Sequence, residues 1–162
     1  MSVEKVDRCV TIRPLLGLRE ARLCARFMTA SEPWVMLKRS YQDSLAIFSD
    51  SSKEIFVAVA EGKVVGFIVL QMHGAFDGTI QSVGVFTGWQ RCGIGRRLIG
   101  FAEERIFSEM ESVFICVSSF NPRAQKLYEQ LGYKVIGELP DPIVAGHAEV
   151  LMRKSSGTAV NS

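Results

Sequence analysis

The chain has 162 residues, which suits one domain with one hydrophobic core. Apolar residues make up 48% and charged residues 22%, and 19 basic residues against 17 acidic ones leave a net charge of +2. This balance favours no nucleic-acid partner, and no apolar run reaches the ~20 residues that span a bilayer. We therefore expect neither a nucleic-acid nor a membrane partner.

The cysteines and histidines favour free thiols over a metal site or a disulfide framework, because they form no Cys-x-x-Cys pair and no ligand cluster. Residues 1–8 include four charged residues and no apolar stretch, so we expect no secretory signal. Free thiols then indicate a reducing compartment, and we expect the cytoplasm. The residues concerned are Cys9, Cys24, Cys92, Cys116, His73 and His147.

The first half of the chain reads as a strand, two helices and a hairpin. Residues 10–13 alternate and precede a proline, as a strand would. Residues 18–28 and 41–48 have helical composition. Residues 54–60 and 64–71 are predicted to be the two strands of a hairpin.

The middle of the chain predicts a strand–helix–strand unit. Residues 79–86 read as a strand, residues 95–110 as a helix and residues 113–117 as a short buried strand. Because a helix makes the crossover, these two strands should be parallel, in an otherwise largely antiparallel sheet.

The last third predicts a helix followed by two strands. Asn121 caps well and Pro122 fits the first helical position, while Gly132 is placed for a left-handed C-terminal cap. Residues 133–137 and 148–153 read as strands. We expect a single α/β (α+β) domain over residues 1–154, and residues 155–162 have the composition of a disordered tail. The sheet should hold about six to seven strands and be flanked by about four helices.

A glycine-rich loop opens the predicted central helix. Gly93 and Gly95 remove side chains, so that backbone N–H groups can approach a ligand closely. The helix start adds unpaired donors and a partial positive charge, and Arg91, Arg96 and Arg97 add more. Together these features predict a site for a pyrophosphate.

Three ligands could use such a loop. A dinucleotide fold needs a third glycine, but Leu98 stands in that position, and a nucleoside-triphosphate loop needs Gly-Lys followed by Ser or Thr, which is absent. The third ligand is coenzyme A.

Two motifs resemble the GCN5-related N-acetyltransferases. Gln90-x-x-Gly93-x-Gly95 matches that family's Gln/Arg-x-x-Gly-x-Gly/Ala pattern, and residues 121–133 resemble its Asn-x-x-Ala-x-x-Leu-Tyr-x-x-x-Gly-Phe/Tyr signature. The motifs occur in the family's order, joined by one helix and one strand. The resemblance covers residues 10–154, and the chain is identified as a member.

The resemblance implies acetyl-coenzyme A as the acyl donor. It implies that the backbone of Val83, Gly84 and Val85 holds the pantetheine arm, and that an N–H of this stretch polarises the thioester carbonyl. Asn121 would contact the coenzyme, cap its helix, or do both. The residues implied to hold the pyrophosphate are Arg91, Cys92, Gly93, Ile94, Gly95 and Arg96.

The resemblance also implies a catalytic acid. Tyr128 matches the tyrosine that protonates the departing thiolate, although it could simply pack on its helix. The reaction would be direct attack by a primary amine in a ternary complex. The acceptor stays open between a peptide N-terminus, a protein lysine and a small amine, and so does a homodimer.

The base that deprotonates the amine is not assigned by the sequence. Residues 115–121 resemble the ribosomal-protein alanine N-acetyltransferases, which have a glutamate base where this chain has Cys116. A buried strand thiol is the preferred reading of Cys116, with a nucleophile as the alternative. Gln81 cannot act as a base. The remaining candidates are His73, Asp77, Glu138, His147 and a water chain.

The acceptor site and the activity also keep alternatives. In the family the acceptor is bordered by the first two helices and the last strands, and Glu32, Trp34 and Tyr41 could line it here. The missing glutamate leaves open a non-catalytic acyl-coenzyme A-binding module. A transferase with a longer acyl donor is the other alternative.

Overall fold

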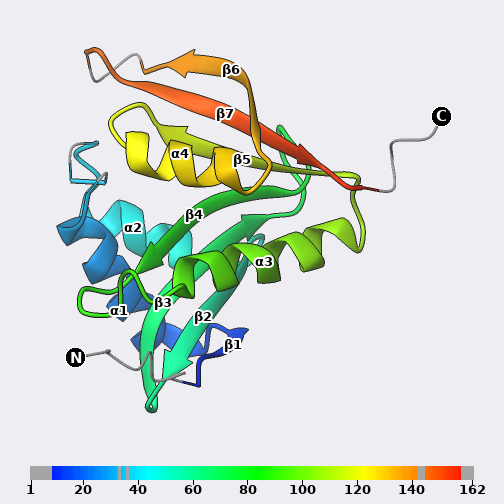
Figure 1. Cartoon of the computed structure of the whole chain (residues 1–162). Helices are drawn as coiled ribbons and strands as arrows, with labels where there is room; N and C mark the ends of the chain where they lie inside the picture. The colour runs from blue at the N-terminus through cyan, green and yellow to red at the C-terminus, as the bar shows by residue number, and fades with distance from the viewer. Residues whose placement is uncertain (1–8, 33, 36, 142–144, 158–162) are drawn as a thin grey trace, which may run out of the picture.

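The computed structural model of the chain describes residues 9–32, 34–35, 37–141 and 145–157. Its strands are β1 (Thr11–Pro14), β2 (Glu54–Ala60), β3 (Lys63–Gln71), β4 (Thr79–Val85), β5 (Ser112–Ser118), β6 (Lys134–Pro140) and β7 (Ala148–Ser155). Its helices are α1 (Gly17–Ala30), α2 (Tyr41–Phe48), α3 (Ile94–Phe107) and α4 (Pro122–Gln130). The strands form one sheet in the order β1-β2-β3-β4-β5-β7-β6, with helices on both faces (Figure 1). The α/β class and the strand and helix order predicted from the sequence are confirmed.

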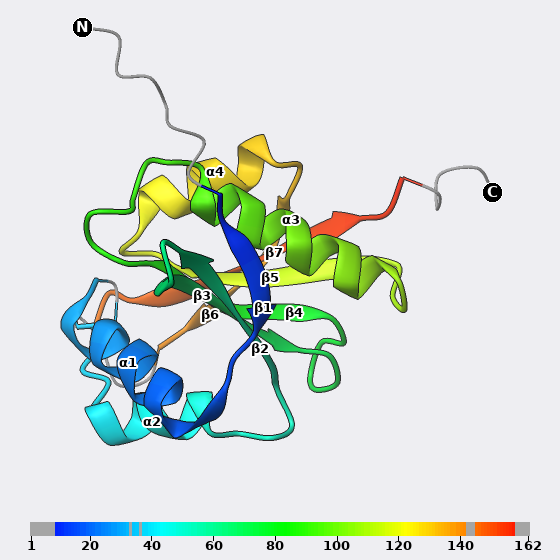
Figure 2. The ribbon, with the colours of Figure 1, turned by 90° about the horizontal axis from the view of Figure 1, so that it is seen from below.

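The sheet is a central layer between two pairs of helices. Figure 2 shows α3 and α4 on one face and α1 and α2 on the other. The inner strand β3 is buried on both faces, which explains its nearly continuous apolar run. Ile68 and Leu70 join the core cluster under α3, whereas Phe67 and Val69 join the cluster under α1.

The pairing of β4 with β5 is parallel and short. Every other neighbouring pair in the sheet is antiparallel, and α3 makes the crossover that a parallel pair requires. The register joins only Thr79 with Phe114 and Ile80 with Ile115. Beyond these two pairs the strands diverge, which positions the site described below.

The helix ends follow the local sequence. Asn121 caps α4, its side-chain oxygen accepting from the Ala124 N–H at 3.2 Å. Gly132 follows that helix with φ +101°, the left-handed conformation predicted for it. Helix α3 ends at Phe107, three residues before the predicted end, and the Ser108 hydroxyl donates to the Arg105 carbonyl at 2.6 Å. Serine favours a helix terminus through such a local bond.

Candidate active site

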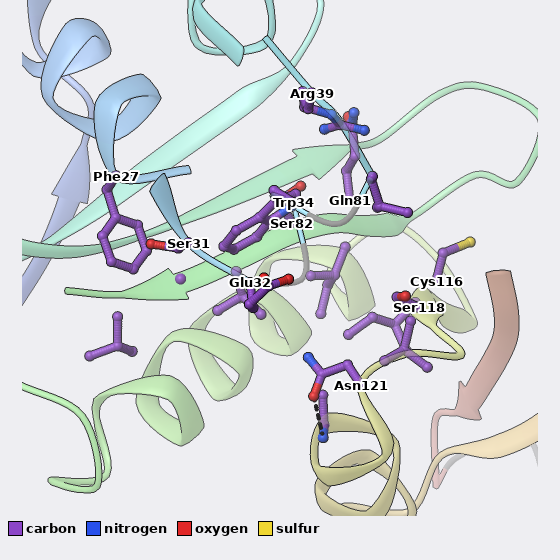
Figure 3. A pocket seen from close by; sticks show the side chains of 18 of the residues that line it. Phe27, Ser31, Glu32, Trp34, Arg39, Gln81, Ser82, Cys116, Ser118 and Asn121 are labelled. Carbon is purple, nitrogen blue, oxygen red and sulfur yellow. Dashed lines mark hydrogen bonds between the residues drawn. The ribbon is translucent and has the colours of Figure 1, made fainter. Parts of the chain in front are cut away.

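A cleft of about 710 Å³ opens where β4 and β5 stop pairing. Its lining comes from both faces of the sheet and from the loop after β4. In Figure 3, Phe27, Ser31, Glu32 and Trp34 line one side, and Cys116, Ser118 and Asn121 line the other. The lining also includes Arg39, Gln81, Ser82, Val83, Gly84, Val85, Thr87, Gln90, Tyr128 and Glu149.

The last residues of β4 form one wall. Val83 and Val85 pack their side chains against the core under α3, which leaves their main chain for the cleft. Gly84 approaches the core so closely that an added Cβ would lie 2.7 Å from the Phe67 ring. Glycine here has a packing reason, beyond the backbone role that the sequence suggested.

The glycine loop continues from this wall into α3. Gly93 is the N-cap of α3 with φ +82°, a left-handed conformation that favours glycine, and no side chain caps the helix. The first-turn N–H groups therefore remain available to an anion. Arg91, Cys92 and Arg96 are exposed, and Ile94 is buried, so that only its main chain could serve a ligand. Residues 91–96 are not among the described lining residues, and their contact with a pyrophosphate stays a prediction.

Tyr128 and Asn121 bring α4 to the cleft. Tyr128 is only 6% exposed and lines the cleft, and its ring centroid lies 6.0 Å from that of Tyr133. Burial raises the pKa of Tyr128 to about 12, so its hydroxyl keeps its proton at neutral pH. Asn121 has the capping role that the sequence offered as one of two readings.

A buried polar network borders the cleft on the α1 side of the sheet. His147 is 4% exposed; its Nδ1 lies 2.8 Å from an Asp141 carboxylate oxygen, and its Nε2 lies 2.9 Å from the Ser118 hydroxyl. Glu149 lines the cleft, with a carboxylate oxygen 3.5 Å from the same Nε2. Burial raises the pKa of the Glu149 carboxyl above its usual range, although the charges of His147 and Arg39 oppose the rise.

Sequence reasoning named His147 as a weak candidate and missed Glu149. The signal was present, because residues 147 and 149 are polar at alternate positions as β7 begins, which places them on one face of a strand. What the sequence could not show is that this face turns toward the cleft.

The remaining candidate bases lie elsewhere. His73 and Asp77 are exposed in the loop between β3 and β4, and Glu138 is exposed on β6; none of the three is among the described lining residues. Gln81 lines the cleft and accepts a hydrogen bond from the Lys53 ammonium group.

Two further predictions concern the acceptor side and the thiol. Glu32 and Trp34 line the cleft as expected, whereas Tyr41 packs into the core cluster under α1. Burial, reinforced by the Glu149 carboxylate, raises the pKa of the Cys116 thiol. A thiol that resists ionisation is a poor nucleophile, which supports the structural reading of Cys116.

The comparison by sequence profile decides the family. The Acetyltransferase (GNAT) family matches residues 18–133. The chain belongs to this family. A sequence comparison with curated proteins gives no match.

Solved GNAT structures share the whole fold. A protein assigned to the GNAT family from Desulfovibrio desulfuricans superposes with a TM-score of 0.74 at 17% identity, over 91% of this chain and 99% of the other. A GCN5-related N-acetyltransferase from Rhodopseudomonas palustris gives 0.71 at 20% identity, over 90% and 95%. An aminoglycoside 6'-N-acetyltransferase complexed with coenzyme A gives 0.69 at 16% identity, over 90% and 96%. At these identities the likeness shows the fold.

The described residues of this GNAT domain lack two kinds of feature. Within that part of the chain, no helix is both long and apolar enough to cross a membrane. The same residues hold no group of three or more His, Cys, Asp or Glu side chains arranged for a metal ion.

Proposed function

We propose that the protein transfers the acetyl group of acetyl-coenzyme A to a primary amine by direct attack in a ternary complex. The observation that carries the proposal is the cleft between the diverging strands, which is lined by Tyr128 and by Thr87 and Gln90 of the loop that leads to the start of α3. Family membership and the coenzyme A complex of a structural neighbour support it. The acceptor is a peptide N-terminus, a protein lysine or a small amine.

The residues present fit the donor. Beyond Ile80 the register between β4 and β5 ends, so the main-chain groups on that edge of β4 suit the amide groups of a pantetheine arm. The uncapped start of α3 suits a diphosphate, and a Cβ at Gly93 would meet no atom within 4 Å, so this helix end is open. Arg91 and Arg96 add two exposed cations at the same end. When bound, acetyl-coenzyme A supplies an acetyl thioester, which an amine can attack.

The protein must then position the two reactants and transfer the protons. The amine nitrogen forms a bond to the acetyl carbonyl carbon, and the bond from that carbon to sulfur breaks. Two protons leave an ammonium nitrogen in the course of the reaction: one ends on the sulfur and one is released. Tyr128 donates the proton to sulfur, because its buried hydroxyl is neutral and lines the cleft.

The test is thiol release from acetyl-coenzyme A with a panel of amines, followed by mass spectrometry of the products. We expect release with at least one amine, and about 10²-fold lower kcat for Tyr128→Phe with unchanged affinity for coenzyme A. Tyr133→Phe is the matched control, because this buried tyrosine is not among the described lining residues. Coenzyme A binding without release for any amine would favour a binding module. Preferred turnover of longer acyl donors would replace acetyl as the group transferred.

A further inference from the structure

Direct attack requires a neutral amine, which most primary amines are not at neutral pH. A lysine-like amine with a pKa of about 10.4 is neutral in roughly one molecule in a few thousand at pH 7. The inference below rests on the proposed function. It concerns which group of this chain takes the proton from the ammonium form of the acceptor. Among the described lining residues, the carboxylates are Glu32 and Glu149.

Glu149 lines the cleft from the start of β7, where this strand pairs with β5. It pairs with Ser118 across β5 and β7, so both side chains point to the same face of the sheet. Cys116, two residues before Ser118, shares that face, whereas Ile115 and Val117 pack into the core under α3. The carboxylate thus faces the acceptor half of the cleft, opposite the half lined by α4.

Glu32 has a different setting. It is exposed, in the segment after α1, whereas the Glu149 side chain is 34% exposed and backed by the buried His147. A bound acceptor would cover the cleft side of Glu149 and separate it from water. The neighbouring His147 would then be the group that can take a proton from Glu149.

The hydrogen bonds constrain the protons of His147. An Asp141 carboxylate can only accept, so Nδ1 donates in the 2.8 Å bond. Nε2 lies 2.9 Å from the Ser118 hydroxyl and 3.5 Å from a Glu149 carboxylate oxygen, and in the tautomer protonated at Nδ1 alone it accepts from Ser118 and can take up a further proton. Asp141, at the far end, has a side chain that is 21% exposed and reaches solvent.

We propose that Glu149 is the general base of the acetyl transfer and that His147, held by Asp141, takes up its proton. An ammonium proton moves to the Glu149 carboxylate and the amine keeps its lone pair. The Glu149 carboxyl then gives that proton to His147 Nε2, which makes His147 an imidazolium whose charge the Asp141 carboxylate stabilises. After the products leave, Nε2 gives the proton to water that enters the cleft, which restores His147 and leaves Glu149 ionised for the next turnover.

The charges around Glu149 are mixed. Arg39, from the segment between α1 and α2, favours its ionised form, as does His147 when both of its ring nitrogens carry protons; Asp141 opposes it, and the Cys116 thiol on β5 faces it. Burial raises the pKa of the Glu149 carboxyl, which makes its carboxylate a stronger base than that of an exposed glutamate.

The test compares pH–rate profiles of wild type and Glu149→Gln with the best amine, from about pH 6 to about pH 9. The rate of the wild-type protein should stay nearly constant over the upper half of this pH range. Glu149→Gln should lose about 10²-fold or more near pH 7, and its residual rate should climb about tenfold per pH unit as the amine deprotonates by itself. Its affinity for coenzyme A should not change. Glu138→Gln, an exposed carboxylate on the neighbouring strand β6, is the matched control and should follow wild type.

Further variants test the proton route and keep the proposal open to refutation if Glu149→Gln folds poorly. Asp141→Asn removes the outer carboxylate, and we expect a lower rate near pH 7 that recovers as pH rises. Glu149→Asp should restore part of the rate that Glu149→Gln loses. An altered profile in Glu32→Gln, with wild-type profiles in Glu149→Gln and Asp141→Asn, would overturn the proposal. An acetyl group trapped on Ser118 would also overturn it, because Ser118, His147 and Asp141 would then be a nucleophilic triad. No transfer by wild type would instead refute the proposed function itself.

Discussion

Replacing Gly84 by alanine tests whether this glycine is required by packing. The added Cβ would lie 2.7 Å from two ring atoms of Phe67 and 3.1 Å from the Phe27 ring. Phe67 cannot move aside easily, because it is fully buried and packs edge-on against Phe48, with ring centroids 4.9 Å apart. Distances under 3.0 Å at a rigid ring require the strand to shift toward the cleft.

The expected cost follows from the size of this clash. Forcing one methyl group into a well-packed core costs about 1–3 kcal/mol in the free energy of unfolding. For a domain of this length, 1 kcal/mol changes the melting temperature by about 2–4 °C. We therefore expect Gly84→Ala to melt about 2–12 °C below wild type. Its KM for acetyl-coenzyme A should also rise, because β4 forms a wall of the cleft.

Differential scanning calorimetry measures this effect against a matched glycine. Gly100 lies in α3 and is exposed, and a Cβ added there would meet no atom within 4 Å. Gly100→Ala should stabilise the protein by up to about 1 kcal/mol through helix propensity. If Gly84→Ala melted together with wild type, the close approach of β4 to the aromatic cluster would be refuted.

Three further predictions use pKa directions. Burial raises the pKa of the Glu149 carboxyl, so the stability that this group contributes is present at low pH and is lost as the pH rises through the raised pKa. The melting temperature of Glu149→Gln, relative to that of wild type, should therefore increase from about pH 4 to about pH 8. Because the Tyr128 pKa is about 12, its ionisation should produce no falling limb in the rate below about pH 11, and a Tyr128-dependent limb near neutrality would contradict its burial. In timed alkylation read by mass spectrometry, exposed Cys9 and Cys92 should react first, Cys116 later, and Cys24, whose pKa burial raises to about 12, last; early reaction of Cys116 would contradict the shielded thiol.

Local sequence signals predicted most of the fold. Apolar alternation and turn residues placed the strands, and Asn121, Pro122 and Gly132 placed both ends of α4, because capping depends on a few neighbouring residues. The helical crossover predicted the parallel pair. The end of α3 was placed three residues too late, since apolar spacing continues to Met110 while Ser108 already bonds to the preceding turn.

The motifs placed part of the candidate site, and the meeting of distant segments lay beyond them. They led to the β4 wall and to Tyr128, all of which line the cleft, whereas the roles of these residues and of residues 91–96 toward coenzyme A stay predictions. The network around His147 joins β5, β7 and the segment after β6, which lie side by side only because the strand order places β7 next to β5. A missing carboxylate at Cys116 could therefore be noticed from the sequence, whereas the carboxylate of Glu149 beside it needed the strand register.

A crystal structure with bound coenzyme A tests the central claim most directly. We expect the pantetheine arm between β4 and β5, and the diphosphate within hydrogen-bond distance of main-chain N–H groups of residues 91–96, with the sulfur near the Tyr128 hydroxyl. A diphosphate bound away from the start of α3, with the gap between the two strands left unfilled, would contradict it.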